Sequence, residues 1–415
     1  MKNRIIYLLI FIFPSLLFCQ KSSLFDSYKI PTYTYHSLNI YGQDFFSFLK
    51  TNHLDNGYSE EHINMTLGSN EYYLSQSLMA THYAQGVALL NYSKDKSGTG
   101  YYGNNTESSV LSIILQSFND WYLTHSKGLF IHFDPALKSV YKFSDNLKSN
   151  LVDLPFGLGF GRIVNVKSIV QSYIISDELK AQLSNEDLLK LAEIIEKYDN
   201  GFYTAKYRDD SEIIFYQDIA TITNKPESAK KIEQILDSPI YKTSQRQMGY
   251  EVKLGINLTL ASAEQLLSNG NGYQSAVYDN GTDLVISGRY ALPIDFDKQL
   301  IASASYSKNP DDGAGRMPKL SLTTTFAFDH NYHWASRIWA NYKNASPEYG
   351  DKLTNFSLGL RSEYAFINTC SVYGSFSYEY RQFTEIASLQ WSPVTQRESK
   401  TESLEFHLGF NYYIE

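Results

Sequence analysis

The sequence predicts an all-β transmembrane barrel of about twelve antiparallel strands, within a range of about ten to fourteen, that carries a small α-helical insertion. Three observations lead to this prediction. Apolar and polar residues alternate through the second half of the chain. The links between these alternating segments are long and short in turn, as they are in barrels that cross an outer membrane. A separate stretch between the two halves has the 3.6-residue period of helices.

The segment that begins at Tyr250 has the clearest alternation. About ten residues of this period cross a bilayer as one tilted strand, with one face against lipid and the other against water. The last segment, from Leu404 to Ile414, repeats the pattern. In the first of these segments, one face consists of Tyr250, Val252, Leu254, Ile256, Leu258 and Leu260, and the other of Glu251, Lys253, Gly255, Asn257 and Thr259.

Residues 247–415 form the second part of the predicted barrel. Outer-membrane barrels have long loops outside the cell and short turns in the periplasm, so the alternation of link length places the C-terminus in the periplasm. The eight expected strands lie near 250–261, 281–292, 299–307, 319–328, 332–342, 353–366, 371–381 and 403–414. The long links are 262–280, 308–318, 343–352 and 382–402, and the short ones are 293–298, 329–331 and 367–370.

Residues 58–165 form the first part of the predicted barrel. Candidate strands lie at 76–92, 108–124, 128–142 and 151–164, and the segment 60–67 is a further candidate. Before them, residues 20–57 are aromatic but have no steady period. We expect this segment to be irregular and to lie in the periplasm, where it either enters the lumen or acts as an ordered tether.

The helical insertion is predicted over residues 166–246. Ser184 is a good N-cap, with acidic residues in the first turn, and Leu188, Leu191 and Ile195 then recur at helical spacing. The strand before the insertion descends and the strand after it ascends, so the insertion is expected in the periplasm. Helices cannot replace a strand of the wall. They must either plug the lumen from below or pack beneath its mouth.

Residues 1–19 have the features of a secretory signal peptide. Two basic residues precede an apolar run that ends at Phe18 and is too short for a comfortable transmembrane helix. Cleavage before Gln20 resembles signal peptides common in the Bacteroidota. The alternative is lipid attachment at Cys19, although lipoprotein signals have a small residue where Phe18 stands. If Cys19 leaves with the leader, only Cys370 remains, which excludes an internal disulfide.

The composition limits the partners. The formal net charge is -8 and no extended basic stripe occurs, so no nucleic-acid partner is expected. The chain contains 34 tyrosines and 24 phenylalanines. Many aromatic residues of this kind are expected in a membrane barrel, where they form girdles at the two bilayer interfaces. A secreted, tyrosine-rich β-sandwich is the alternative for such a composition.

The run from Gly157 to Gly161 has a glycine at every second position. It differs from a dinucleotide-binding loop because its third glycine comes one residue too early and the run lies within a strand, so no cofactor is predicted. Alternate glycines leave room on one face of a barrel strand. The insertion begins a few residues later. We therefore expect Gly157, Gly159, Gly161 and Arg162 to seat the insertion.

This glycine-rich strand is followed by Arg162, Ile163 and Val166 and then by capped helices. The order resembles a group of outer-membrane barrels of Gram-negative bacteria, of Bacteroidota type, that carry a periplasmic helical insertion. The resemblance covers about residues 150–200. It implies an outer-membrane location and this architecture, with no activity attached.

Charged residues on the presumed inner face of the barrel form either a field that selects solutes or a ladder of mutually neutralising ion pairs in a filled lumen. Both signs occur on neighbouring strands, so both interpretations stay open. The candidate lumen-facing charges are Glu251, Lys253, Arg361, Glu363, Glu379 and Arg381.

No enzyme site is expected. His125 and Ser126 fall in a short turn, and His333 and Ser336 lie on opposite faces of a strand, so neither pair suits a serine lipase. The histidines are scattered without a zinc-binding pattern. The acidic loop Asp311–Gly313 is either a calcium site or a solvated turn, and no metal is predicted.

The leading functional hypothesis is a narrow or plugged channel or transporter for small solutes, because about twelve strands enclose less space than a wide pore. The alternative is a non-enzymatic scaffold or assembly protein whose helices dock a periplasmic partner. A third class is a soluble secreted β-protein that binds glycans. The expected partners are outer-membrane lipid, a small-molecule solute and a periplasmic protein.

Overall fold

The structure is a computed structural model of the 415-residue chain. The predicted signal peptide, residues 1–19, lies outside the part of the chain that it describes, as do His125, Ser126 and the loop Asp311–Gly313. The described residues are 23–28, 33–53, 58–76, 80–97, 104–123, 128–142, 147–199, 202–225, 228–238, 240, 246–266, 273–278, 281–308, 318–345, 352–367, 370–387 and 395–414.

One sheet contains all sixteen strands found in these ranges, and its pairings are antiparallel. The strands are β1 (Tyr33–His53), β2 (Tyr58–Gln76), β3 (Ala80–Ser97), β4 (Asn104–Tyr122), β5 (Gly128–Phe133), β6 (Ala136–Lys142), β7 (Leu147–Asn165), β8 (Gln247–Leu266), β9 (Tyr273–Tyr278), β10 (Gly281–Pro293), β11 (Lys298–Lys308), β12 (Lys319–Asn331), β13 (Trp334–Ala345), β14 (Lys352–Ile367), β15 (Cys370–Ala387) and β16 (Thr395–Ile414).

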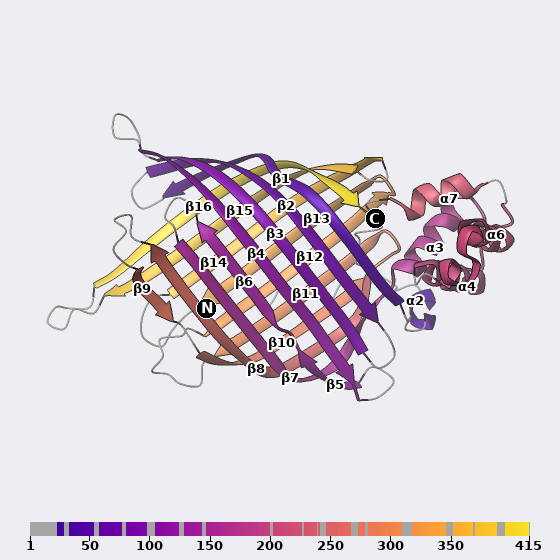
Figure 1. Ribbon diagram of the computed structural model, residues 1–415, viewed down its shortest axis with the longest axis horizontal. Helices are drawn as coiled ribbons and strands as arrows, with labels where there is room; N and C mark the ends of the chain where they lie inside the picture. The colour runs from indigo at the N-terminus through magenta and orange to yellow at the C-terminus, as the bar shows by residue number, and fades with distance from the viewer. Residues whose placement is uncertain are drawn as a thin grey trace.

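The sheet closes on itself as a barrel (Figure 1). Strand β1 pairs with β16, and β7 pairs with β8 along its whole length. Both β5 and β6 lie between β4 and β7, and both β9 and β10 pair with β8, so each of these couples occupies one position in the wall. The described strands therefore fill fourteen wall positions, at the upper end of the expected range.

The first two strands account for the difference from twelve. The expectation of an irregular segment over 20–57 is wrong for Tyr33–His53, which is β1. The pairing of β1 with β16 is interrupted between Gly42 and Phe46, where β1 contains extra residues. Such an irregularity divides the strand into two short alternating parts, and each is shorter than the span that makes a transmembrane strand recognisable in sequence.

The two faces of the wall differ in chemistry, as the alternation predicts. Outward side chains are large, apolar and exposed, and the inward neighbours of many of them line cavities. A soluble surface does not carry an apolar band of this extent, whereas the lipid-facing side of a barrel does. A two-layer sandwich is excluded because a single closed sheet forms the wall. Outward residues include Ile131, Phe156, Leu158, Phe160, Val252, Leu254, Leu258, Ile338, Leu360, Phe376, Leu404 and Phe406.

The helical insertion lies between β7 and β8 in the chain and beyond one end of the barrel in space (Figure 1). Ser184 caps its second helix as predicted, because its hydroxyl accepts the backbone N–H of Asp187 at 3.2 Å. No helix in the described ranges is long and apolar enough to cross a membrane. The helices are α3 (Lys167–Glu178), α4 (Asn185–Asp199), α5 (Phe202–Tyr207), the short 3₁₀ helix η1 (Arg208–Asp210), α6 (Ser211–Thr223) and α7 (Ala229–Leu236).

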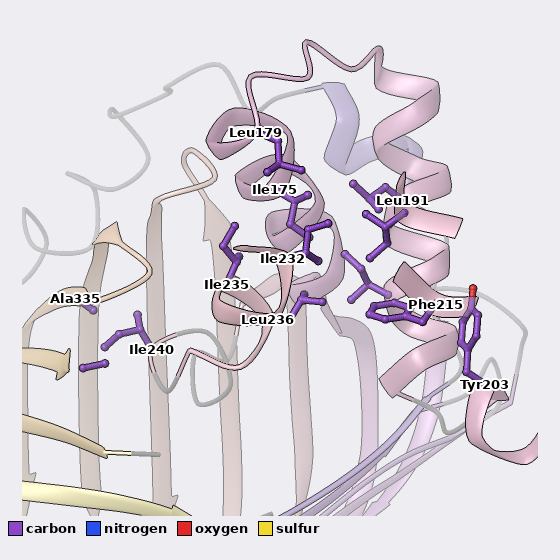
Figure 2. Packing of buried hydrophobic residues seen from close by; sticks show 13 residues of the cluster. Ile175, Leu179, Leu191, Tyr203, Phe215, Ile232, Ile235, Leu236, Ile240 and Ala335 are labelled. Carbon is purple, nitrogen blue, oxygen red and sulfur yellow. The ribbon is translucent and has the colours of Figure 1, made fainter. Parts of the chain in front are cut away.

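The insertion has a hydrophobic core of its own, which Figure 2 shows. The core includes Leu191 of α4 and Phe215 of α6, and it reaches the barrel through Ile240 and two alanines, Ala335 of β13 and Ala365 of β14. Of the two expected placements, the structure therefore has the helices packed at the mouth and not inside the lumen.

The short helix α2 (Ser23–Ser27) packs against the insertion as well. Leu24 and Phe25 are fully buried with residues of α3 and α4, and the ring of Phe25 lies 5.1 Å from that of Phe296 in the turn after β10. Tyr28 donates a hydrogen bond to Glu196 of α4. Residues 23–28 thus act as a tether at the barrel mouth and do not enter the lumen.

Candidate functional site in the barrel lumen

Within the part of the chain that the structure describes, two cavities open on the inner face of the wall. The first, called here the β3–β12 cavity, has a volume of about 460 Å³. Strands from eight adjacent wall positions, β3 to β12, enclose it, so it extends over more than half of the described ring. It is lined by Thr81, Tyr83, Gln116, Phe118, Asp120, Tyr122, Asp134, Ile163, Asn165, Gln247, Glu251, Lys253, Ser287, Gly288, Arg289, Ser303, Ala304, Ser305 and Ser321.

Lys253 is the centre of a buried ion cluster beside this cavity. Its Nζ atom lies 2.8 Å from Oδ1 of Asp120 and 3.1 Å from Oδ2 of Asp134. His132 Nδ1 lies 3.2 Å from the same oxygen of Asp134. All four side chains are nearly inaccessible to solvent. Because ion pairs in such surroundings are weakly screened, the lysine joins β8 firmly to β4 and to the end of β5.

Asp134 and Pro135 interrupt the wall between β5 and β6. The break keeps its backbone hydrogen bonds, because Asp134 N–H donates to the carbonyl of Pro155 and the carbonyl of Pro135 accepts Ser117 N–H, both at 2.9 Å. Proline cannot donate to the ladder and is tolerated in a sheet at such irregular points. Asp134 continues the inward alternation of Phe130 and His132, and its carboxylate lies 3.1 Å from Lys253 Nζ.

The glycines of β7 have a different role from the predicted one. A Cβ atom on Gly159 would lie 2.1 Å from the ring of Phe130, and one on Gly157 would lie 2.9 Å from the His132 ring and 2.1 Å from a backbone oxygen of β8. The glycines therefore make room for side chains of the neighbouring strand β5 and for the backbone of β8. The expectation that they seat the helical insertion is wrong for Gly157 and Gly159.

Gly161 and Arg162 complete this packing within the wall. Gly161 has a φ of +100°, a conformation that other residues rarely adopt, and a Cβ there would meet the backbone of Tyr250 at 2.3 Å. Arg162 is fully buried, and its guanidinium lies 4.1 Å from the ring centroid of Tyr122, so that the cation contacts an aromatic face. Both residues thus contact neighbouring strands of the barrel.

The second cavity, called here the β12–β16 cavity, has a volume of about 610 Å³. Five of its side chains are charged, two of which, Arg361 and Glu379, belong to the predicted inner-face set, and amide and hydroxyl groups fill much of the remaining lining. It is lined by Thr325, Arg337, Trp339, Asn341, Lys343, Asn355, Ser357, Arg361, Tyr373, Ser375, Ser377, Glu379, Glu405 and His407.

The predicted charges of this region form short-range pairs along single strands. On β14, Arg361 Nη2 lies 3.1 Å from Glu363 Oε2, and on β15, Arg381 Nη2 lies 3.2 Å from Glu379 Oε1. Glu363 also accepts a 2.7 Å hydrogen bond from Asn411. Of the two interpretations of the inner charges, this geometry favours the ladder of neutralising pairs for these four residues.

Glu251 and Lys253, by contrast, line the β3–β12 cavity together with charges that the sequence analysis did not select: Asp120, Asp134 and Arg289. Asp120 and Phe118 alternate along β4 with outward residues such as Trp121, so the inward face of the segment 108–124 was a usable signal. Asp134 lies within the expected strand 128–142, on the same alternating face as Phe130 and His132, so the alternation was a usable signal there as well.

His333 and Ser336, the described histidine and serine candidates, do not contact each other in a catalytic arrangement. His333 Nδ1 lies 3.0 Å from the carbonyl oxygen of Ala365, and Ser336 contacts His330 instead, with 3.0 Å between Nε2 and Oγ. Within the described ranges, no group of three or more His, Cys, Asp or Glu side chains has a metal-binding arrangement.

Comparisons with known proteins give structural neighbours only. No protein-family model matches the sequence, and no curated protein does. The toluene transporter TodX of P. putida is 8% identical over 93% of this chain and 91% of its own, with a TM-score of 0.37. OccK7 of Pseudomonas aeruginosa is 10% identical over 91% and 99%, with a TM-score of 0.29. OmpT, an outer membrane protein of Vibrio cholerae, is 11% identical over 91% and 98%, with a TM-score of 0.31.

Proposed function

We propose that this chain is a narrow channel for small polar solutes in the outer membrane of a Gram-negative bacterium. One observation carries the proposal: a single closed sheet has an exposed apolar outer face and an inner face of charged, amide and hydroxyl side chains around two cavities. Such a wall is stable in a bilayer because its apolar side chains contact lipid, its backbone hydrogen bonds are satisfied within the sheet, and its polar side chains lie in the lumen. The membrane lipid is thus one partner and a small solute the other.

The orientation follows from the links. The short turns after β10 and β12 lie at the same end as the helical insertion, and this is the periplasmic end by the usual distribution of loop length. The tether α2 lies at that end as well, next to the point where a secreted chain would begin in the periplasm.

The channel is narrow because the barrel has few strands and side chains fill part of its lumen. Barrels of about eight strands are filled by side chains, and those of about sixteen or more leave a wide aqueous pore. Here the buried rings of Tyr122 and Phe130 and the Lys253 cluster occupy one side of the lumen, which narrows the passage.

A scaffold function is the second candidate. It is supported by the position of the helices, which form their own core outside the lumen and expose apolar side chains such as Phe202 (42%) and Ile213 (58%). A periplasmic protein could bind to α5 and α6 through these side chains.

Channel conductance in planar bilayers tests the proposal, with heat-modifiable migration in gels as the check of folding. The structure allows a clean deletion of the insertion, since Asn165 pairs with Gln247 and Val166 N–H donates to the carbonyl of Arg246 at 2.8 Å. Residues 167–245 can therefore be replaced by Asn-Gly, which forms a tight hairpin turn.

We expect the full chain to conduct, and we expect the deletion variant to conduct with similar or larger steps because the helices lie outside the lumen. Folded but silent barrels from both proteins would contradict the channel and favour the scaffold. A large rise in conductance on deletion would mean that the helices obstruct the pore.

A further inference from the structure

The ionic groups of the β3–β12 cavity largely neutralise one another. Lys253, which lines the cavity, lies within 3.1 Å of two carboxylates of the same lining, Asp120 and Asp134. Arg289 donates a hydrogen bond to Gln247, and it lies directly opposite Glu251 in the pairing of β10 with β8. A charged solute would compete with these contacts. The cavity therefore suits an uncharged solute better than an ion.

An exposed aromatic ring lies in this polar cavity. Phe118 of β4 is 41% exposed although it lines the lumen, and its ring centroid lies 5.7 Å from that of Tyr83 on β3. Other aromatic side chains of the lumen, such as Phe130 and Tyr122, are covered by neighbouring side chains and expose almost no surface. A phenylalanine that keeps an apolar face open to the lumen offers a flat surface to the C–H face of a passing solute.

The opposite side of the same cavity presents small polar side chains. Ser287 of β10, Ser303 and Ser305 of β11 and Ser321 of β12 line it, and four wall positions separate β4 from β11. Hydroxyls both donate and accept hydrogen bonds, so they can pair with the hydroxyls of a ligand that carries no charge. Gln116 and Asn165 add amide groups to the same lining.

From this juxtaposition we infer that the β3–β12 cavity is a binding site for a neutral saccharide of one or two rings. A sugar ring has one apolar C–H face and a rim of hydroxyls, which match the Phe118 ring and the serine side of the cavity. The volume of about 460 Å³ is within the usual range for small-molecule sites. This inference rests on the proposed channel and names its solute class.

The test uses the purified full chain in planar bilayers, with potassium chloride current as the readout and maltose as the probe. Polyethylene glycol of similar size is the control for simple obstruction. Phe118→Leu keeps much of the volume and removes the aromatic face. Phe156→Leu is the matched control, because Phe156 lies on the outer face of β7 and is also well exposed.

We expect maltose to reduce the current in a saturable way, with polyethylene glycol giving only a linear, non-saturating decrease. In Phe118→Leu the apparent affinity for maltose, measured against the sugar-free current of the same variant, should fall about tenfold, the effect of losing one aromatic contact. In Phe156→Leu it should not change.

Equal effects of maltose and the polymer, or an unchanged affinity in Phe118→Leu, would overturn the saccharide site and leave the channel intact. If the full chain conducts no current at all, the channel proposal fails. Calorimetric titration of maltose into the detergent-solubilised barrel then decides the site separately: binding that Phe118→Leu weakens supports it, and no binding overturns it.

Discussion

Replacing Lys253 with methionine tests whether the ion cluster holds the barrel wall together. Lys253→Met keeps the length of the side chain and removes its charge. The Asp120 carboxylate, 2.8 Å from Nζ, then loses its closest cation, and Asp134 keeps the contact with His132 at 3.2 Å and the backbone N–H of Asn119 at 3.1 Å. Both carboxylates stay nearly inaccessible to water because the backbone that buries them is unchanged.

The expected loss follows from this geometry. Breaking a buried ion pair by removing one partner costs about 3–5 kcal/mol, since the remaining charge is left uncompensated. His132 can still stabilise Asp134, so we expect the lower part of that range, about 3 kcal/mol. In the double variant with Asp120→Asn, the uncompensated charge disappears, and the combined loss should be about 1–2 kcal/mol smaller than the sum of the two single losses.

The measurement is urea unfolding of the full chain in lipid vesicles, followed by the fluorescence of its four tryptophans. Asp120→Asn alone is the control, because Lys253 then keeps Asp134 as its partner. A free energy of unfolding for Lys253→Met within about 0.5 kcal/mol of the parent, or strictly additive effects in the double variant, would refute the role of the cluster.

Two further predictions concern β7 and the tether. Gly159→Ala should lower the free energy of unfolding by about 1–3 kcal/mol, because its Cβ would lie 2.1 Å from the Phe130 ring, and adding Phe130→Leu should recover part of the loss if that clash is the cause. Burial raises the pKa of Glu196 to about 7, although the hydrogen bond from Tyr28 opposes the rise. A raised carboxyl pKa stabilises the fold at pH values below its unfolded pKa of 4.5, and that stabilisation is lost as the pH rises through about 7. The protection of α4 amides from hydrogen exchange, corrected for the chemical exchange rate, should therefore fall as the pH rises from about 5 to about 8. In Glu196→Gln the protection should stay constant over this range. An equal fall in both proteins would show that ionisation of Glu196 is not the cause.

The strands of the second half were predictable because their signal is local. From Tyr250 to Leu260, lipid on one side and the lumen on the other impose a strict period of two on the side chains. The N-cap at Ser184 was predictable for a similar reason, since a cap and its helix lie within a few residues of each other. Strand β1 was missed because an irregularity after Gly42 divides its pattern.

The site was less predictable than the strands. The glycines of β7 indicated a close approach by another element, but the sequence could not distinguish the rings of β5 from the helical insertion that follows. The pairing of Lys253 with Asp120 and Asp134 joins residues more than a hundred positions apart, so no local pattern contains it.

The sequence by itself determined the chemistry of each face: which residues of a strand contact lipid, which contact the lumen, and where the helices begin. Only the tertiary structure decided which inward residues meet. Closure of the sheet fixes the register of every strand against its neighbours, and this register brings Lys253 to its carboxylates and sets Phe118 across the lumen from the serines of β11. Local periodicity specifies a direction for each side chain, whereas contact across a barrel depends on the whole ring.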